Sequence, residues 1–256
     1  MDTSDLERAI SALRRMPVLD ACRETSLSRK QLAEHTSLSR TTVYRATVAL
    51  EEQGLLEQTA AGYRTTSKGA TLSAAGETYV AAVEAIDHLE PLIALVDDPE
   101  LVDHAHLLED ATLVVSDASN PYRVVDRVIE RLEETTTSRG TITSVTALEA
   151  MQRANSSLES VDHIERIFAA SALEAHETIG GDEFREVTAS DAVSILVADD
   201  ASIPFSFSID DDEMVTIVGH DPATGLPTVY VESGRSEART WLEAVYDRCR
   251  ADATPF

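Results

Sequence analysis

The chain has 256 residues, of which 46 are Asp or Glu and 21 are Lys or Arg, so its formal charge is −25. With 43% apolar residues it can build folded cores, and its length suits one large domain or two ordinary ones. The apolar runs are too short for a membrane span and the acidic N-terminus argues against a signal peptide, so we expect a cytoplasmic protein without membrane contact. Its two cysteines, Cys22 and Cys249, lie far apart in the sequence, which argues against a disulfide framework or a structural zinc site.

The charged residues are unevenly distributed along the chain. Residues 1–70 hold ten bases and nine acids, whereas residues 71–256 hold eleven bases and 37 acids. Only Lys30 and Lys68 are lysines, and so many carboxylates are typical of proteins from a salt-rich cytoplasm. A nearly neutral first part beside a strongly acidic remainder indicates an anionic partner for the first part, unless the bases gather there by chance.

The first part of the chain has the spacing of a helix-turn-helix. A first helix is predicted from Ser4 to Arg23, with Pro17 as the point where it splits. Ser28 is placed to cap a short second helix, residues 36–38 form a tight turn, and Ser39 is placed to cap a third helix. The inward face of this third helix is formed by Val43, Ala46, Thr47 and Leu50.

The outward face of the third helix has the chemistry of a DNA-reading surface. Hydroxyl and guanidinium groups near the start of a helix suit a major groove, where Arg bridges guanine edges and Thr contacts a thymine methyl group. The alternative is an ordinary helical hairpin whose polar face is solvated. The DNA contacts predicted from the two helices and their caps are Ser28, Arg29, Lys30, Ser39, Arg40, Thr41, Thr42, Tyr44 and Arg45.

A β-hairpin is predicted directly after this helix. Residues 55–59 and 63–66 are strand-like, and Gly62 lies in the turn between them. A hairpin in this position is a wing, from which Arg64 and Lys68 would reach phosphates or a minor groove. We therefore expect residues 1–70 to form a winged helix-turn-helix domain that binds double-stranded DNA.

These motifs resemble a known family of regulators. The segment QLAEHTSLSRTTVYRATVALEEQGLLEQTAAGYRTTSKG is similar to the winged helix-turn-helix of archaeal, and here haloarchaeal, transcription regulators. The segment VTIVGHDPATGLPTVYVESGRSEARTWLEAVYDRCR resembles the C-terminal domain of the methanogenesis-regulator (FilR-like) family. The first match covers about residues 10–75 and the second is looser, while residues 98–190 match only in the order of their elements. The resemblance implies a DNA-binding part joined to an effector-sensing domain.

A long amphipathic helix is predicted over residues 67–96, with a bend at Pro91. We assign residues 71–97 to a connecting and dimerisation helix, which would space two DNA-binding domains over adjacent half-sites. The alternative is that its apolar stripe packs on the chain's own C-terminal part. The predicted dimer seam consists of Leu72, Tyr79, Val83, Ile86, Leu89 and Ile93.

Residues 98–256 are predicted to form an α/β domain with a mixed sheet, so that the whole chain is of the α + α/β class. The expected strands cover residues 112–116, 141–145, 192–198, 205–209, 214–219 and 228–232. The expected helices cover residues 122–134, 147–154 and 158–175, followed by a closing helix from Ser236.

The C-terminal domain lacks the sequence motifs of common enzymes. It has no glycine-rich phosphate loop and no Gly-x-Ser-x-Gly motif. Residues 69–256 contain no lysine, which excludes a Schiff base and a His-x-Lys phosphodiesterase site. The pair His104 and His106 is interpreted as exposed polar surface rather than a metal site. We therefore expect a protein that is not an enzyme and needs no cofactor or metal.

One loop of this domain is a candidate effector site. Residues 116–120 follow a strand and enter a helix, the place where open α/β sheets commonly bind ligands. The simpler interpretation is that Asn120 and Pro121 only begin the helix. The predicted effector contacts, including two on the strand expected to lie alongside, are Ser116, Ser119, Asn120, Arg123, Thr143 and Ser144.

The sequence thus predicts a homodimeric, sequence-specific DNA-binding transcription regulator whose C-terminal domain senses a small metabolite. Its partners would be operator DNA, a second copy of itself and a small-molecule effector. One alternative is that the C-terminal domain is only a dimerisation or protein-interaction module. A less favoured alternative is an enzyme with an accessory DNA-binding domain, for which residues 98–256 offer no catalytic constellation.

Overall fold

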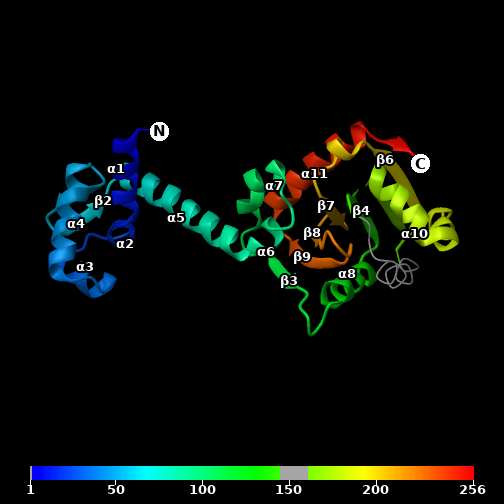
Figure 1. Ribbon diagram of the computed structural model, residues 1–256. Helices are drawn as coiled ribbons and strands as arrows, with labels where there is room; N and C mark the ends of the chain where they lie inside the picture. Colours follow the sequence, from blue (N-terminus) through cyan, green and yellow to red (C-terminus); the bar gives the residue numbers. More distant parts are fainter. Residues whose placement is uncertain (1, 145–160) are drawn as a thin grey trace. The chain divides into compact units, whose positions relative to one another are not determined.

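The computed structural model describes residues 2–144 and 161–256 (Figure 1). The chain divides into two compact units, here called the head (residues 1–81) and the body (residues 82–256). The boundary falls within one helix, α5, which covers Ser67–His88. No helix in the described ranges is long and apolar enough to cross a membrane.

The head contains four helices and a hairpin before α5. Its elements are α1 (Thr3–Leu13), α2 (Met16–Ala21), α3 (Arg29–Thr36), α4 (Arg40–Glu52), β1 (Leu56–Thr59) and β2 (Gly62–Thr65). The first helix predicted to run from Ser4 to Arg23 is therefore two helices. The break falls at Arg14 and Arg15, before Pro17, because proline fits the first turn of a new helix, where its missing N–H costs nothing.

The predicted helix caps of the head are confirmed. The Ser28 hydroxyl accepts a hydrogen bond from the Gln31 backbone N–H, and the Gln31 side chain accepts one from Ser28 N–H, which completes a capping box. The Ser39 hydroxyl accepts from Thr42 N–H at the start of α4. Ser37, in the turn between the two helices, has a φ of 57°. The buried core of the head includes Val18, Leu19, Leu32, Val43, Leu50, Leu55 and Tyr63.

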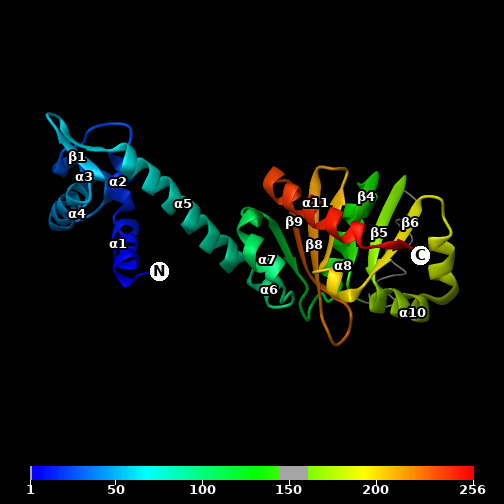
Figure 2. The same ribbon diagram turned by 90° about the horizontal axis from the view of Figure 1, so that it is seen from above.

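The body is built around one large sheet, with helices on both faces (Figures 1 and 2). Its helices are α6 (Glu90–Ile93), α7 (Pro99–His104), α8 (Arg123–Glu133), α10 (Ala170–Thr188) and α11 (Ser236–Ala251), with short 3-10 turns at Ala105–Leu108 and Asp200–Ser202. Its strands are β3 (Thr112–Val115), β4 (Thr137–Ile142), β5 (His163–Ala169), β6 (Val193–Ala198), β7 (Ser206–Asp210), β8 (Met214–His220), β9 (Pro227–Ser233) and β10 (Thr254–Pro255).

The eight strands follow the order β10-β6-β5-β4-β7-β8-β9-β3. Strands β4, β5 and β6 pair in parallel, and the other pairs are antiparallel. This arrangement confirms the predicted mixed sheet and the α + α/β class. The face that packs on α11 is closed by a buried apolar core, whose members include Ile209, Val215, Ile217, Val231, Leu242 and Val245.

Two predicted elements of the body are wrong in type or position. The helix expected over residues 158–175 contains the strand β5 in its described part, and helix α10 begins only at Ala170. Apolar residues at 164, 167 and 168 have helical spacing, but β5 pairs with β4 and β6 on both of its edges. Such an internal strand carries buried apolar residues without strict alternation, which makes the periodicity ambiguous. The strand expected at 141–145 lies earlier, at Thr137–Ile142. The helix expected over 147–154 lies outside the described residues.

The connecting segment also differs from its prediction. Helix α5 ends at His88 and α6 begins at Glu90, so the segment is two helices rather than one helix bent at Pro91. Leu89 is completely buried in the body core, and Ile93 packs against that core. Both were expected in the dimer seam, and this was wrong because their side chains complete the interior of their own body.

Candidate nucleic-acid interface and body cavity

Helix α4 presents its polar side chains to solvent as its sequence periodicity requires. Val43, Ala46, Thr47 and Leu50 are buried in the head. On the opposite side Arg40, Thr41, Thr42, Tyr44 and Arg45 are all exposed, and Tyr44 has 54% of its surface accessible. The start of α4 thus carries two guanidinium groups, two hydroxyl groups and a phenol on one accessible surface. Such a set can donate to base edges and phosphates and can contact a thymine methyl group.

Arg29 differs from the other predicted DNA contacts because its guanidinium is engaged within the head. Its Nε donates to the Thr47 hydroxyl at 3.0 Å. The guanidinium carbon lies 4.6 Å from the ring centroid of Tyr44 and 5.0 Å from that of Tyr63. Arg29 therefore joins α3 to α4 and to the hairpin, and it fixes one face of the exposed Tyr44 ring.

The hairpin is attached to the head through its backbone. Leu27 and Tyr63 exchange two backbone hydrogen bonds of 3.0 and 2.9 Å. Gly62 has a φ of +138°, and a Cβ atom placed there would lie 2.4 Å from the carbonyl carbon and oxygen of Leu27. Only glycine fits this close approach. Arg64 is exposed on β2, whereas Lys68 donates its Nζ to the Gln53 carbonyl at 2.8 Å, just after α4 ends.

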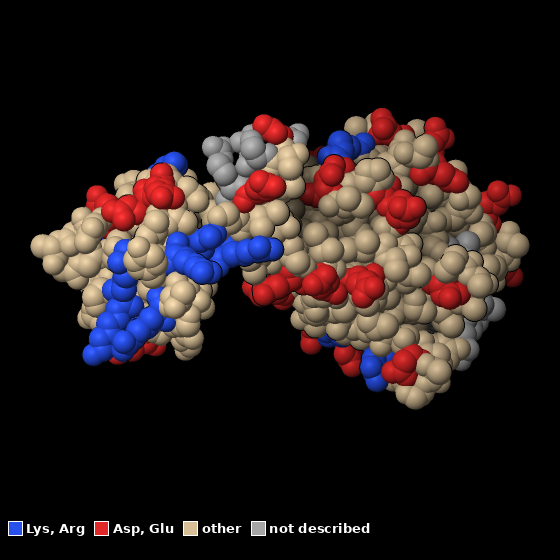
Figure 3. Space-filling model, turned by 60° about the vertical axis from the view of Figure 1, so that its left-hand side comes forward, with Lys and Arg blue, Asp and Glu red and all other residues tan. Residues whose placement is uncertain are grey.

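Basic side chains gather on one face of the head, and acidic side chains are scattered over the body surface (Figure 3). The predicted contacts Lys30, Arg40, Arg45 and Arg64 are all exposed. The hydroxyls of Ser28 and Ser39 are committed to the helix caps described above. Four exposed cations on a single small unit therefore form the positive surface that an anionic polymer would meet.

The loop predicted as an effector site satisfies its own polar groups. The Asp117 carboxylate accepts from the N–H groups of Ser119 and Asn120, and it forms an ion pair with Arg123 at 3.6 Å. The pKa of Asp117 is lowered chiefly by a hydrogen bond from the Ser119 hydroxyl, and further by these backbone hydrogen bonds and the ion pair. Ser116 accepts from Val124 N–H at the start of α8. The donors expected to bind a ligand are thus already occupied within the loop.

The expected second half of that site lies elsewhere in the sheet. Thr143 and Ser144 were expected beside residue 116, but β7, β8 and β9 separate β4 from β3 in the strand order. Thr143 donates its N–H to the Ser206 hydroxyl instead. The prediction was wrong because β3 and β4, although consecutive along the chain, are not neighbours in the sheet, which sequence periodicity does not reveal.

The body contains a cavity of about 250 Å³ on the sheet face toward α8 and α10. Its walls are mainly apolar, with side chains from α8, α10 and strands β4 to β9. Register explains which residues reach it, because Arg166, Ile195, Ser208 and Thr216 lie in one row across paired strands. In this row β4 contributes Gly140, paired with both Arg166 and Ser208, so no side chain stands there.

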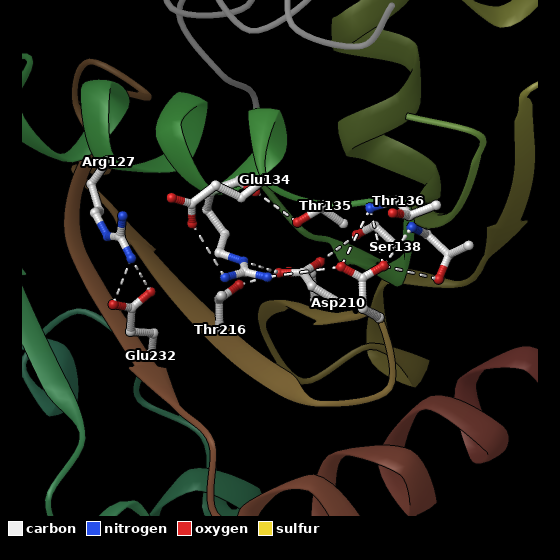
Figure 4. Close-up of polar contacts among 12 residues, drawn as sticks. Arg127, Glu134, Thr135, Thr136, Ser138, Asp210, Thr216 and Glu232 are labelled. Carbon is white, nitrogen blue, oxygen red and sulfur yellow. Dashed lines mark hydrogen bonds and ion pairs between the residues drawn. The ribbon is translucent and has the colours of Figure 1, made fainter. Parts of the chain in front are cut away.

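One end of the cavity is formed by a cluster of charged and hydroxyl groups. Arg166 donates to the Ser138 hydroxyl at 2.7 Å, and Ser138 donates to the Asp210 carboxylate at 2.6 Å; Figure 4 shows the second of these links. Burial raises the pKa of Asp210, although the Ser138 hydrogen bond and the nearby Arg166 oppose this shift. Burial also lowers the pKa of Arg166, an effect that the Asp210 charge opposes. The cluster is therefore poorly hydrated, which strengthens its electrostatic interactions.

Two histidines line another part of the cavity. His176 Nδ1 forms a 2.8 Å hydrogen bond with the Ala172 carbonyl, so Nδ1 carries the proton and Nε2 is an acceptor. Burial lowers the pKa of His220 to about 4, with a further contribution from His176. Burial also lowers the pKa of His176. Both rings are therefore neutral at pH 7.

Residues 121–252 match the family described as methanogenesis regulatory protein FilR1, middle domain. This range is just over half of the chain. The chain belongs to this family. The matched range contains every residue that lines the cavity. A second match, to the HVO_A0261 N-terminal domain, covers residues 3–88 and therefore the whole of α4 and the hairpin.

Beyond the family, the chain has some distant structural likenesses. It is similar to TrmBL2, titled an archaeal chromatin protein with a novel mode of DNA binding, at 15% identity and a TM-score of 0.42, over 96% of this chain and 94% of that chain. It is also similar to NucT from Helicobacter pylori, at 10% identity and a TM-score of 0.44, over 57% of this chain and 99% of that one. Nuc from Salmonella typhimurium, a phospholipase D family member, has 15% identity and a TM-score of 0.40, over 57% and 99%. No curated protein matches the chain.

Proposed function

We propose that this protein is a transcription regulator that binds double-stranded operator DNA sequence-specifically in the cytoplasm. The observation that carries the proposal is the exposed start of α4, where Thr41, Tyr44 and Arg45 share one accessible face on a capped helix. This is the geometry in which a recognition helix enters a major groove. Membership of a family of regulatory proteins supports the same function.

The exposed residues of the head divide into two roles. Arg45, Thr41 and Tyr44 read base edges and thymine methyl groups from α4. Arg40, Lys30 and Arg64 neutralise phosphates on either side and fix the register of the head on the duplex. Arg29 acts indirectly, because its guanidinium holds the Tyr44 ring, and Lys68 stabilises the end of α4 through the Gln53 carbonyl.

We further propose that the regulator is a homodimer joined through α5. Leu72, Tyr79, Val83 and Ile86 are spaced by seven, four and three residues, so they form one stripe on the helix. Between 37% and 59% of the surface of each is exposed in the single chain. A second copy of α5 would bury this stripe and present two heads to two half-sites of one operator.

The body is proposed to bind a small-molecule effector rather than to serve only as a dimerisation module. The cavity supports this function because it combines apolar walls with a few convergent polar groups, as small-molecule sites do. We place the effector in the cavity and not at the Ser116–Arg123 loop, whose donors are internally occupied. We propose no catalytic role for the body, because it contains no lysine and no nucleophile motif.

The test of DNA recognition begins by selecting bound fragments from random DNA with the full-length protein. Parent, Arg45→Ala and Arg64→Ala proteins are then titrated against the selected operator and a scrambled duplex, with Arg185→Ala in the body as a control. We expect Arg45→Ala to lose about 5- to 150-fold at the operator, which corresponds to about 1–3 kcal/mol, and little on scrambled DNA. Arg64→Ala should weaken both complexes equally. If selection enriches no sequence, the proposal is wrong.

A further inference from the structure

The apolar walls of the body cavity are incompletely packed. Val128 and Leu132 on α8, Ile195 on β6 and Val218 on β8 are only half-buried, although all four line the cavity from different elements. Folded interiors are normally packed to crystal-like density, and an enclosed apolar surface gains free energy when another apolar group covers it. The walls therefore favour an occupant that is largely apolar.

The charged end of the cavity favours an occupant that carries an acceptor. Arg131 forms three long ion pairs, of 3.6 Å with Glu134, 3.7 Å with Asp210 and 4.0 Å with Asp211. Its Nε is buried and finds no hydrogen-bond partner within the described parts of the chain. A buried donor without an acceptor is unfavourable, and an acceptor brought by a ligand would remove this cost.

Arg166 lies at the same end, and among the residues that the structure describes it uses only part of its donor capacity. It donates to the Ser138 hydroxyl and to the Glu165 carbonyl, which uses two of the five N–H groups of a guanidinium. Two arginines that line one cavity and share one buried carboxylate, Asp210, provide the forked donors that a second carboxylate prefers.

We propose that the cavity binds a small monocarboxylic acid with an apolar body, whose carboxylate contacts Arg131 and Arg166 and whose body lies between α8, α10 and the sheet. The volume of about 250 Å³ lies just below the usual range of ligand pockets, so the acid is small. The neutral imidazoles of His176 and His220 accept a hydrogen bond from any hydroxyl on that body. Only the role of the acid as an effector rests on the proposed function. Binding of the acid to the cavity does not depend on DNA recognition.

The experiment measures binding to the full-length protein without DNA, in molar potassium chloride. Calorimetry and thermal unfolding are recorded with a panel of acids of four to ten carbons, such as hexanoate, benzoate and 3-phenylpropionate, each paired with its neutral amide. We expect at least one acid to bind once per chain and to raise the melting temperature, and its amide to bind at least tenfold more weakly. An acid that binds no better than its amide, or a panel without any binder at millimolar concentration, would overturn the proposal.

Matched variants locate the binding site. Arg131→Gln should weaken acid binding at least tenfold and amide binding little, whereas Arg185→Gln, an exposed change of equal charge on α10, should alter neither. Arg166→Gln is the second test of the charged end. Val128→Phe fills the apolar part of the cavity and leaves both arginines in place. The Val128→Phe protein should therefore bind neither the acid nor the amide. Unchanged acid binding by folded Arg131→Gln and Val128→Phe proteins would place the ligand elsewhere. Operator titration with and without the acid is a separate measurement, so a failure of DNA recognition would not be mistaken for a failure of ligand binding.

Discussion

The guanidinium carbon of Arg29 lies 4.6 Å from the centre of the Tyr44 ring, and thereby connects the first helix of the helix-turn-helix to the exposed face of the second. Arg29 also contacts Tyr63 of the hairpin, at 5.0 Å. One cation thus holds together the three elements from which the proposed DNA interface is built. The rotamer of Tyr44, which no buried core restrains, depends on this contact.

Replacement of Arg29 by methionine is expected to reduce operator discrimination although the head remains folded. Methionine keeps the length of the side chain but removes the cation–π interaction, which is worth about 0.5–2 kcal/mol, and leaves Tyr44 free to change rotamer. The measurement is fluorescence anisotropy with operator and scrambled duplexes, together with thermal unfolding. Arg23→Met, at an exposed ion pair with Glu77, is the control and should change neither. Equal losses on both duplexes would indicate that Arg29 acts only as a phosphate contact.

The paired change Val83→Glu with Ile86→Lys is expected to give a folded monomer. Both side chains are exposed on α5, at 38% and 47%, so charges there are solvated in the single chain but buried in the proposed seam. Light scattering should report half the parent mass, and operator affinity should fall roughly tenfold or more as two linked heads become one. Val102→Glu, at a residue that is 63% exposed on α7, is the matched control and should remain dimeric. A persistent dimer would move the interface away from α5.

The stability of the body should fall as the pH is lowered from about 6.5 to about 4. His220 has a pKa of about 4 in the fold, whereas an unfolded histidine titrates near 6.5, so the unfolded chain binds the proton first. The contribution is fully present above pH 6.5 and, at about 1.4 kcal/mol per pKa unit, amounts to about 3 kcal/mol at most. Denaturant unfolding across this range should show a smaller decrease for His220→Gln than for the parent. His106→Gln, at an exposed residue, should follow the parent. Parallel curves for parent and His220→Gln would contradict the assignment.

Raising the salt concentration is expected to stabilise the body. Residues 71–256 carry 37 acids and eleven bases, and their mutual repulsion is screened as the Debye length falls to about 3 Å near 1 M. Circular dichroism during thermal unfolding in a potassium chloride series should show a rising midpoint up to molar salt. Operator affinity should persist there if discrimination rests on base contacts more than on phosphate charge. A protein most stable in dilute buffer, whose binding disappears by a few tenths molar, would contradict the salt-adapted interpretation.

The head could be predicted closely because its signals are local. The capping hydroxyl of Ser39 accepts a hydrogen bond from a backbone N–H only three residues further along the chain. The periodicity of α4 needs only one turn of helix to identify Val43 and Ala46 as inward. The turn at Gly62 is likewise specified by one residue and its neighbours. Each of these features is complete within a few positions of the sequence.

Contacts between distant positions could not be predicted in the same way. Arg29 was predicted as a DNA contact, and its contact with Tyr63 could not be predicted because Tyr63 lies 34 positions away in the sequence. The cavity was missed because its lining comes from six strands and two helices, and its polar end depends on the strand order that brings Asp210 beside Ser138. Leu89 was assigned to the seam because its spacing fits an exposed stripe as well as a buried one.

The sheet of the body ends in very short strands at both edges. On one side β10 pairs only Thr254 and Pro255 with β6, and on the other β3 contributes four residues beside β9. Short edges and a proline offer few consecutive backbone donors to another chain. The body is thereby protected from strand-by-strand polymerisation, a hazard for any protein that is concentrated on a DNA template. The short edges thus favour self-association through side chains on helices, as proposed for α5, where single substitutions can tune it.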